Sequence, residues 1–178
     1  MGSGLTLRIN RAPVLTLWAA VVAERRGAPW DAALTMGQTM AGLTAFSKGV
    51  RLGIYTPSEK APAPAPPLPP GARRVHDVIL LGRRIHVAET PDGMRAIAKA
   101  EVVKPAAVER YLVSRFGEAL DSVREDMEQL AGSFEPEELE AQGFHLYEQF
   151  RPEVPAGEKG WGAKGALDTA RIRALVKR

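Results

Sequence analysis

The residues with the clearest chemical potential form a glycine-rich stretch, Gly157–Asp168, with the sequence GEKGWGAKGALD. Part of it, Gly160–Gly165, has the G-x-G-x-x-G spacing of dinucleotide-binding loops. That spacing binds a dinucleotide only between a strand and a helix of a βαβ unit, with an acidic residue about 20 positions further on. Here the residues RPEVPAGEK precede the glycines instead of a strand. The spacing therefore predicts no dinucleotide site.

Two interpretations of this stretch remain open. In the first, free N–H groups of the loop and the N-terminus of the next helix bind an anion, and Trp161 stacks on a base. In the second, Trp161 fills the core of the protein while the glycines let the backbone lie flat over it. Asp168 favours the second, because a carboxylate that caps the helix opposes an anion there. The cationic contacts of the first would be Lys159, Lys164, Arg171 and Arg173.

Pairs of arginines elsewhere in the sequence extend this basic set. Arg73–Arg74 and Arg83–Arg84 are the main ones, and the isoelectric point is 9.4. Basic side chains that converge on one face form the electrostatic surface that binds phosphate backbones. We therefore expect a nucleic acid or another polyanion to bind a composite surface made of Arg73, Arg74, Arg83, Arg84, Lys159, Trp161, Lys164, Arg171 and Arg173.

The charge distribution along the sequence supports an alternative. Residues 105–157 hold twelve Asp and Glu against four Lys and Arg, whereas residues 158–178 hold six Lys and Arg against two Asp and Glu. Such blocks predict either internal charge matching or separate basic and acidic faces. A protein-interaction adaptor with matched basic and acidic faces is therefore the second functional class.

Little in the sequence points to catalysis. The chain has no cysteine, which excludes thiolate nucleophiles and thiolate metal sites. His145 and Glu148 stand one helical turn apart, but no second histidine follows at the spacing of a zinc motif. We expect no cofactor and no metal, and an enzyme with a pocket near Trp161 and His145 is a distant third possibility.

The N-terminal part, residues 1–55, is expected to form a helical hairpin. The first helix contains the apolar run Ala12–Ala23, which also has the shape of a signal peptide; the charged ERRG that follows favours a buried helix. The second helix, from Pro29 to about Lys48, carries small residues at four-residue spacing, which indicates close packing on the first helix or on a twin helix in a homodimer. This ridge consists of Ala33, Gly37, Ala41 and Ala45.

The rest of the chain is expected to hold a linker and one mixed domain. Residues 56–72, rich in Pro and Ala, favour an extended polyproline II spacer. Residues 73–178 predict a small antiparallel β-hairpin or meander, with TPDG at 90–93 as a turn, and then a C-terminal helical bundle. Met94–Val103 alternates as one strand whose Arg95 side faces solvent. The predicted fold class is thus α+β and mostly α.

Several segments resemble a family of small uncharacterised bacterial proteins with no assigned activity. They are RINRAPVLTLWAAVVAERRG, SKGVRLGIY, LYEQFRPEVP and KGWGAKGALD. The resemblance implies a bacterial, soluble, cytoplasmic protein and provides no site residues. No stretch approaches the ~20 apolar residues that span a bilayer, so no membrane association is expected.

Overall fold

The computed structural model describes residues 5–51, 72–98, 101–153 and 164–177, with backbone alone for 44–51. Its helices are α1 (Arg11–Arg25), α2 (Trp30–Arg51), α3 (Pro105–Phe116), the 3-10 turn η1 (Gly117–Ala119), α4 (Leu120–Gly132), α5 (Pro136–Phe150) and α6 (Thr169–Ala174). Its strands are β1 (Thr6–Asn10), β2 (Val75–Leu80), β3 (Arg83–Thr90), β4 (Gly93–Ala98), β5 (Glu101–Val102) and β6 (Lys164–Asp168). The predicted class, mixed α and β with mostly helix and small antiparallel sheets, is confirmed.

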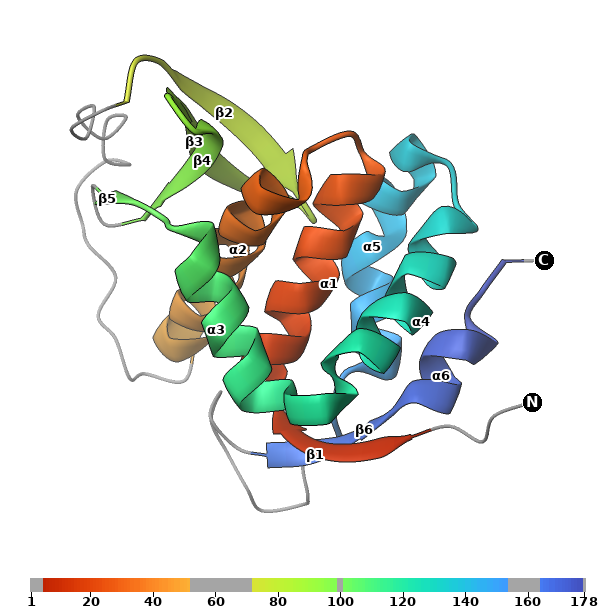
Figure 1. Ribbon diagram of the computed structural model, residues 1–178. Coiled ribbons are helices and arrows are strands. Elements are labelled where there is room, and N and C mark those ends of the chain that lie inside the picture. Colours follow the sequence, from red (N-terminus) through yellow and green to blue (C-terminus); the bar gives the residue numbers. More distant parts are fainter. Residues whose placement is uncertain (1–4, 52–71, 99–100, 154–163, 178) are drawn as a thin grey trace.

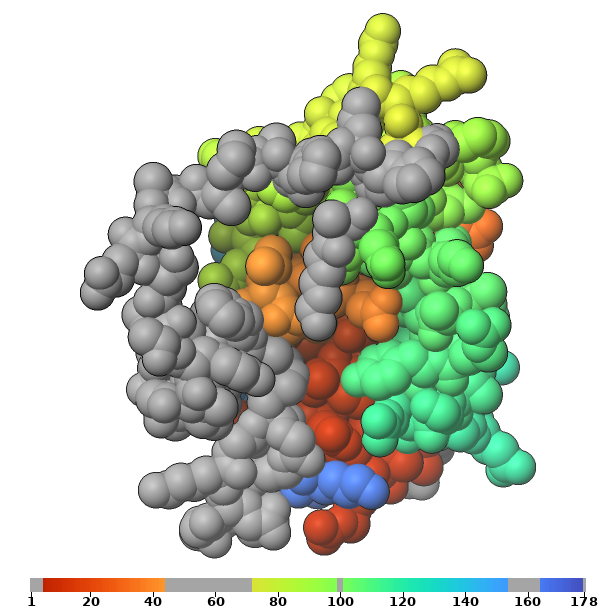
Figure 2. All heavy atoms as spheres, turned by 90° about the vertical axis from the view of Figure 1, so that its left-hand side faces the viewer, coloured from red at the N-terminus to blue at the C-terminus, as the bar shows by residue number. Residues whose placement is uncertain are grey.

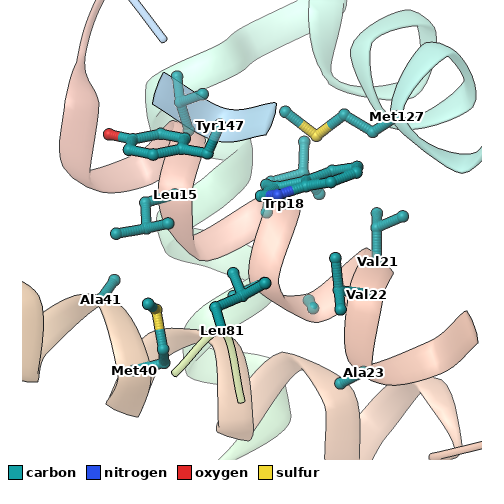
Figure 3. Close-up of a cluster of buried hydrophobic side chains, with 14 of the residues drawn as sticks. Leu15, Trp18, Val21, Val22, Ala23, Met40, Ala41, Leu81, Met127 and Tyr147 are labelled. Atoms are coloured by element: carbon teal, nitrogen blue, oxygen red, sulfur yellow. The ribbon is translucent and has the colours of Figure 1, made fainter. Parts of the chain in front are cut away.

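Helix α1 forms the centre of the molecule, with other helices on several sides of it (Figure 1). An unbroken run from Pro13 to Ala23 is buried, which confirms the buried helix expected from the apolar sequence. Its Trp18 donates a hydrogen bond of 2.9 Å from Nε1 to the carbonyl of Gly143 in α5. Figure 3 shows Trp18 among Leu15, Tyr147 and Met127, so this helix brings the elements of the core together.

Helix α2 packs on α1 through the predicted ridge of small residues. Ala33, Gly37 and Ala41 are buried. A Cβ atom at Gly37 would lie 2.5 Å from the carbonyl oxygen of Thr16, so only glycine allows this approach. The ridge therefore packs within the chain, and these three residues offer no surface to a second copy. The side chain of Ala45 lies outside the described residues, and a homodimer stays a prediction.

The larger sheet has four antiparallel strands in the order β2-β3-β4-β5. The turn between β2 and β3 consists of Leu81 and Gly82, at φ of 50° and 81°. The predicted turn over residues 90–93 is confirmed. The single strand expected over Met94–Val103 was wrong, because the chain reverses between β4 and β5.

The sheet is attached to the helices at two points. The buried Thr35 hydroxyl in α2 accepts a hydrogen bond of 2.9 Å from the amide of Ala96 in β4. At the other end of the sheet, the carboxylate of Glu140 in α5 accepts the amides of Leu81 and Gly82 at 3.2 and 3.3 Å. Leu81 also packs directly on Gly143, where a Cβ atom would have no room. These contacts fix the sheet relative to α2 and α5.

The C-terminal helices form the expected bundle, and each buries an apolar stripe. Gly117 ends α3 at φ of 58°, and Pro136 is the first residue of α5. The buried side of α5 consists of Leu139, Gly143, Leu146, Tyr147 and Phe150. None of the described helices is long and apolar enough to cross a bilayer.

A second, two-stranded sheet was not predicted. β1 and β6 pair antiparallel, with Leu7 opposite Leu167, and lie together at one end of the molecule (Figure 1). The glycine-rich loop was expected to include Lys164 and Gly165, and this was wrong because both residues lie in β6. Gly165 packs directly on the backbone of Pro152 and Glu153, which leaves no room for a side chain. The glycine that suggested a loop therefore allows close contact between β6 and the residues that follow α5.

Candidate functional site

The predicted basic residues occupy three separate places rather than one surface. Arg73 and Arg74 precede β2, and Arg83 and Arg84 begin β3 at the other end of the hairpin. Lys164 lies in β6, with Arg171 and Arg173 in α6, on the far side of the helices from the larger sheet (Figure 1). Lys159 and Trp161 lie outside the described residues. The single composite surface expected from the sequence does not form from the seven described residues.

The cations of α6 and the residues after it are matched to the acidic block. Arg171 pairs with Glu153 at 2.5 Å, and Arg173 Nε pairs with Asp126 at 3.0 Å. Lys177 pairs with Glu138 at 2.9 Å, and this hydrogen bond lowers the pKa of the Glu138 carboxyl. Asp168 caps α6, as predicted, by accepting the Ala170 amide at 2.9 Å. These ion pairs are the internal charge matching that the sequence left as an alternative.

The Arg83–Arg84 end of the hairpin also carries acidic partners. The Asp77 carboxylate lies 4.0 Å from the guanidinium of Arg84 and 2.8 Å from Nδ1 of His86. Arg84 and Thr90 lie near opposite ends of β3, about 20 Å apart at the rise of a strand. This end is therefore separate from the end where Arg73 and Arg74 lie.

Arg73 and Arg74 lie beside the turn between β3 and β4. The Arg73 amide donates to the Glu89 carbonyl at 2.9 Å, and the Glu89 amide donates to the Arg74 carbonyl at 3.0 Å. Both side chains are exposed, and neither has a hydrogen bond or ion pair in the described part of the chain. Figure 2 shows the start of β2, in yellow, projecting from the molecule next to the light green residues around this turn.

The turn itself fixes the side chain of Arg95, which is only 9% exposed. The guanidinium donates to the carbonyls of Met94 at 2.8 Å and Asp92 at 3.1 Å. Thr90 stabilises the turn, because its hydroxyl donates to the Gly93 carbonyl and accepts the Asp92 amide. Gly93 has a φ of 118°, and a Cβ atom there would lie 3.3 Å from Nη1 of Arg95. The positive φ thus favours glycine in the turn, and a Cβ atom there would press against the guanidinium.

Arg95 lines a cavity of about 310 Å³ between this turn and the start of α3. The cavity is lined by Thr90, Pro91, Asp92, Arg95, Val102, Val103, Lys104 and Pro105. Lys104 is exposed and stands at the N-cap of α3, where its side chain makes no capping bond. The positive end of the α3 dipole therefore adds to the two cations of the cavity.

The electrostatics of this cavity favour an anion. Burying a charge without an opposite charge is costly, because a charged group loses its hydration. Arg95 has two carbonyl partners but no carboxylate within ion-pair distance in the described part of the chain. Asp92 is the one acidic residue among the described residues of the wall. We call the group Arg73, Arg74, Arg95 and Lys104 the basic sheet end.

A second cavity, of about 290 Å³, lies between α1 and α4 and is lined by charges of both signs. Glu24, Arg25 and Glu128 line it. The neighbouring Arg124 lies 2.7 Å from the Glu128 carboxylate and stacks 3.7 Å above the ring of Trp30. Since these charges already have partners, this cavity gives less reason to expect a charged ligand.

The third possibility, a pocket near Trp161 and His145, has no geometric support among the described residues. His145 is exposed on α5 and lines neither cavity, and Trp161 lies outside the described residues. Within the described ranges, no three His, Asp or Glu side chains gather as metal ligands.

Sequence reasoning missed the two cations of the cavity. Strict alternation put Arg95 on a solvent-facing side, whereas the turn carbonyls hold it in a nearly buried position. Lys104 had no motif around it. The available signal was the TPDG turn with an arginine two residues after its glycine, because a guanidinium there reaches back to the turn carbonyls.

Comparison with known proteins adds no functional assignment. No family model matches the chain, and neither a curated protein nor a solved structure is detectably similar. The resemblance to small bacterial proteins stays a prediction, as does the cytoplasmic location.

Proposed function

We propose that this protein is a non-enzymatic nucleic-acid-binding protein that contacts phosphate groups through the basic sheet end. The observation that carries the proposal is Arg95, a nearly buried guanidinium without a carboxylate partner in the described part of the chain, at the wall of a cavity. Nucleic acids supply the regularly spaced negative charges that such a group favours.

The neighbouring cations support the same location. Arg73 and Arg74 are exposed and have no ion pair within the described ranges, and their backbone bonds to Glu89, next to Thr90 in the cavity wall. Side chains in this state bind phosphates without first breaking an ion pair with any described residue. Arg171 and Arg173 lack this property, because Glu153 and Asp126 hold them. The proposed surface is therefore smaller than the one expected from the sequence.

The first test compares two double variants that remove the same charge. Arg73→Ala with Arg74→Ala should weaken the binding of fluorescent DNA and RNA oligonucleotides, measured by anisotropy. It should also reduce the slope of log K against log salt by about one for each phosphate that the protein no longer binds. Arg83→Ala with Arg84→Ala, at the opposite end of the hairpin, is the matched control and should bind nearly as the unmodified protein does.

An equal decrease in affinity in the two double variants would mean that net charge alone matters, and the assignment to this end would be wrong. No binding at low salt would refute the function itself. Capture of a stoichiometric protein partner in the absence of nucleic acid would favour the alternative, an interaction adaptor with matched basic and acidic faces.

A further inference from the structure

Arg95 lies mostly buried in the wall of the cavity at the basic sheet end, so access to its guanidinium is restricted. Only 9% of Arg95 is exposed, and Pro91 and Pro105 are part of the surrounding wall. An internal phosphodiester continues into a sugar on both sides, so it must approach this mostly buried guanidinium with two bulky substituents. A terminal phosphate has one substituent and presents three oxygens to the cavity.

The positive charge of the cavity also favours a terminal phosphate over an internal one. A phosphomonoester carries about 1.5 to 2 negative charges at pH 7, whereas each internal phosphate carries one. Arg95 and Lys104 supply two positive charges in the wall, and the start of α3 adds the positive end of its dipole. Guanidinium groups bind phosphate oxygens through charge-assisted hydrogen bonds. Two of the Arg95 nitrogens each donate to a turn carbonyl, which fixes the group before any ligand arrives.

We propose that this cavity binds the terminal phosphate of a nucleic-acid strand, with Arg95 and Lys104 as its cationic contacts. The inference rests on the proposed function, because it assigns one phosphate of the bound strand to the cavity. Arg73 and Arg74 then contact internal phosphates next to that end.

Asp92 provides a test in which a substitution should increase affinity for a terminal phosphate rather than decrease it. Asp92 belongs to the same wall, and its negative charge disfavours an anion there. It forms no ion pair with Arg95, and its backbone, rather than its side chain, bonds to Thr90 and Arg95. Asp92→Asn keeps a residue that is favourable in turns. This change should therefore increase affinity for a terminal phosphate.

The experiment compares three probes in a buffer without phosphate or sulfate. They are a single-stranded oligonucleotide with a 5′-phosphate, the same strand with a 5′-hydroxyl, and inorganic phosphate, which is titrated directly by calorimetry and also used as a competitor. The 5′-phosphorylated strand should bind roughly tenfold more tightly than the hydroxyl strand, the size expected for one or two charge-assisted bonds. Inorganic phosphate at millimolar concentration should reduce this difference.

The variants assign that difference to the cavity. Arg95→Gln and, separately, Lys104→Ala should reduce the preference for the 5′-phosphate, and Asp92→Asn should increase it. Arg84→Gln removes one charge at the distant end of the hairpin and should leave the preference unchanged. Thermal melting checks the fold of each variant. If Arg95→Gln is unfolded, Lys104→Ala and Asp92→Asn still test whether the cavity binds the 5′-phosphate.

The possible outcomes separate the inference from the proposed function. Equal affinity for both strands, with no effect of Asp92→Asn, would overturn the inference and leave nucleic-acid binding intact. Binding of inorganic phosphate that depends on Arg95, without binding of either strand, would support a phosphate site and refute nucleic-acid binding. Absence of binding by all three probes would overturn both.

Discussion

At the scale of single residues, the buried Tyr147 couples stability to alkaline pH. Its hydroxyl donates to the Arg11 carbonyl at 3.3 Å, and burial raises the pKa of the phenol. The unfolded phenol ionises near pH 10, whereas the folded one remains protonated to higher pH. The unfolded state therefore loses its proton first, and stability falls as pH rises above about 10.

Urea denaturation at pH 8 and at pH 10.5 measures this effect. We predict a lower unfolding free energy at pH 10.5, with a smaller decrease in Tyr147→Phe, which removes the ionisable group and keeps the ring. Tyr111, whose pKa burial also raises, accounts for a part that Tyr147→Phe does not remove. The same decrease in both proteins would show that Tyr147 is not responsible.

At the scale of elements, the packing of α2 on α1 depends on Gly37 and not on Gly42, five positions further along the same helix. A Cβ atom at Gly37 would meet the backbone of Thr16 and Ala20, whereas one at Gly42 would have nothing within 4 Å. Gly37→Ala should destabilise the protein by about 1–3 kcal/mol through overpacking. Gly42→Ala should stabilise it by about 0.5–1 kcal/mol, since alanine is the better helix former.

Thermal or urea denaturation of the two variants provides the measurement, and each serves as the control for the other. Destabilisation of similar size in both would mean that α2 does not approach α1 as closely as described. Stabilisation by Gly37→Ala would contradict the packing of the ridge directly.

The elements show why some of the structure was predictable from sequence and some was not. Helical stripes such as those of α4 and α5 are local, so periodicity and Pro136 suffice to predict them. The pairing of β1 with β6 joins residues far apart in the chain, and the bond from the Leu5 amide to Thr169 spans 164 positions, so no local pattern encodes it. Arg95 was misplaced because its burial depends on a turn and a neighbouring helix together.

At the scale of the whole molecule, the charge blocks of the sequence have a structural explanation. The cations in α6 and in the residues that follow it pair with carboxylates of the acidic block. This pairing connects α6 to α4 and to the residues after α5. Asp126 lies almost buried in one such pair, with a side chain 8% exposed. The basic sheet end, whose four cations pair with no carboxylate in the described part of the chain, lies on the other side of the helices from α6 (Figure 1).

Amide chemical-shift mapping tests that placement most directly. The 15N-labelled protein is titrated with a 5′-phosphorylated single-stranded oligonucleotide at low salt. We predict that the largest shifts fall on Arg73, Arg74, the turn Thr90–Arg95 and Lys104, and that they decrease as salt is added. Shifts concentrated on β6 and α6, or a spectrum that the oligonucleotide does not change, would contradict the basic sheet end as the phosphate-binding surface.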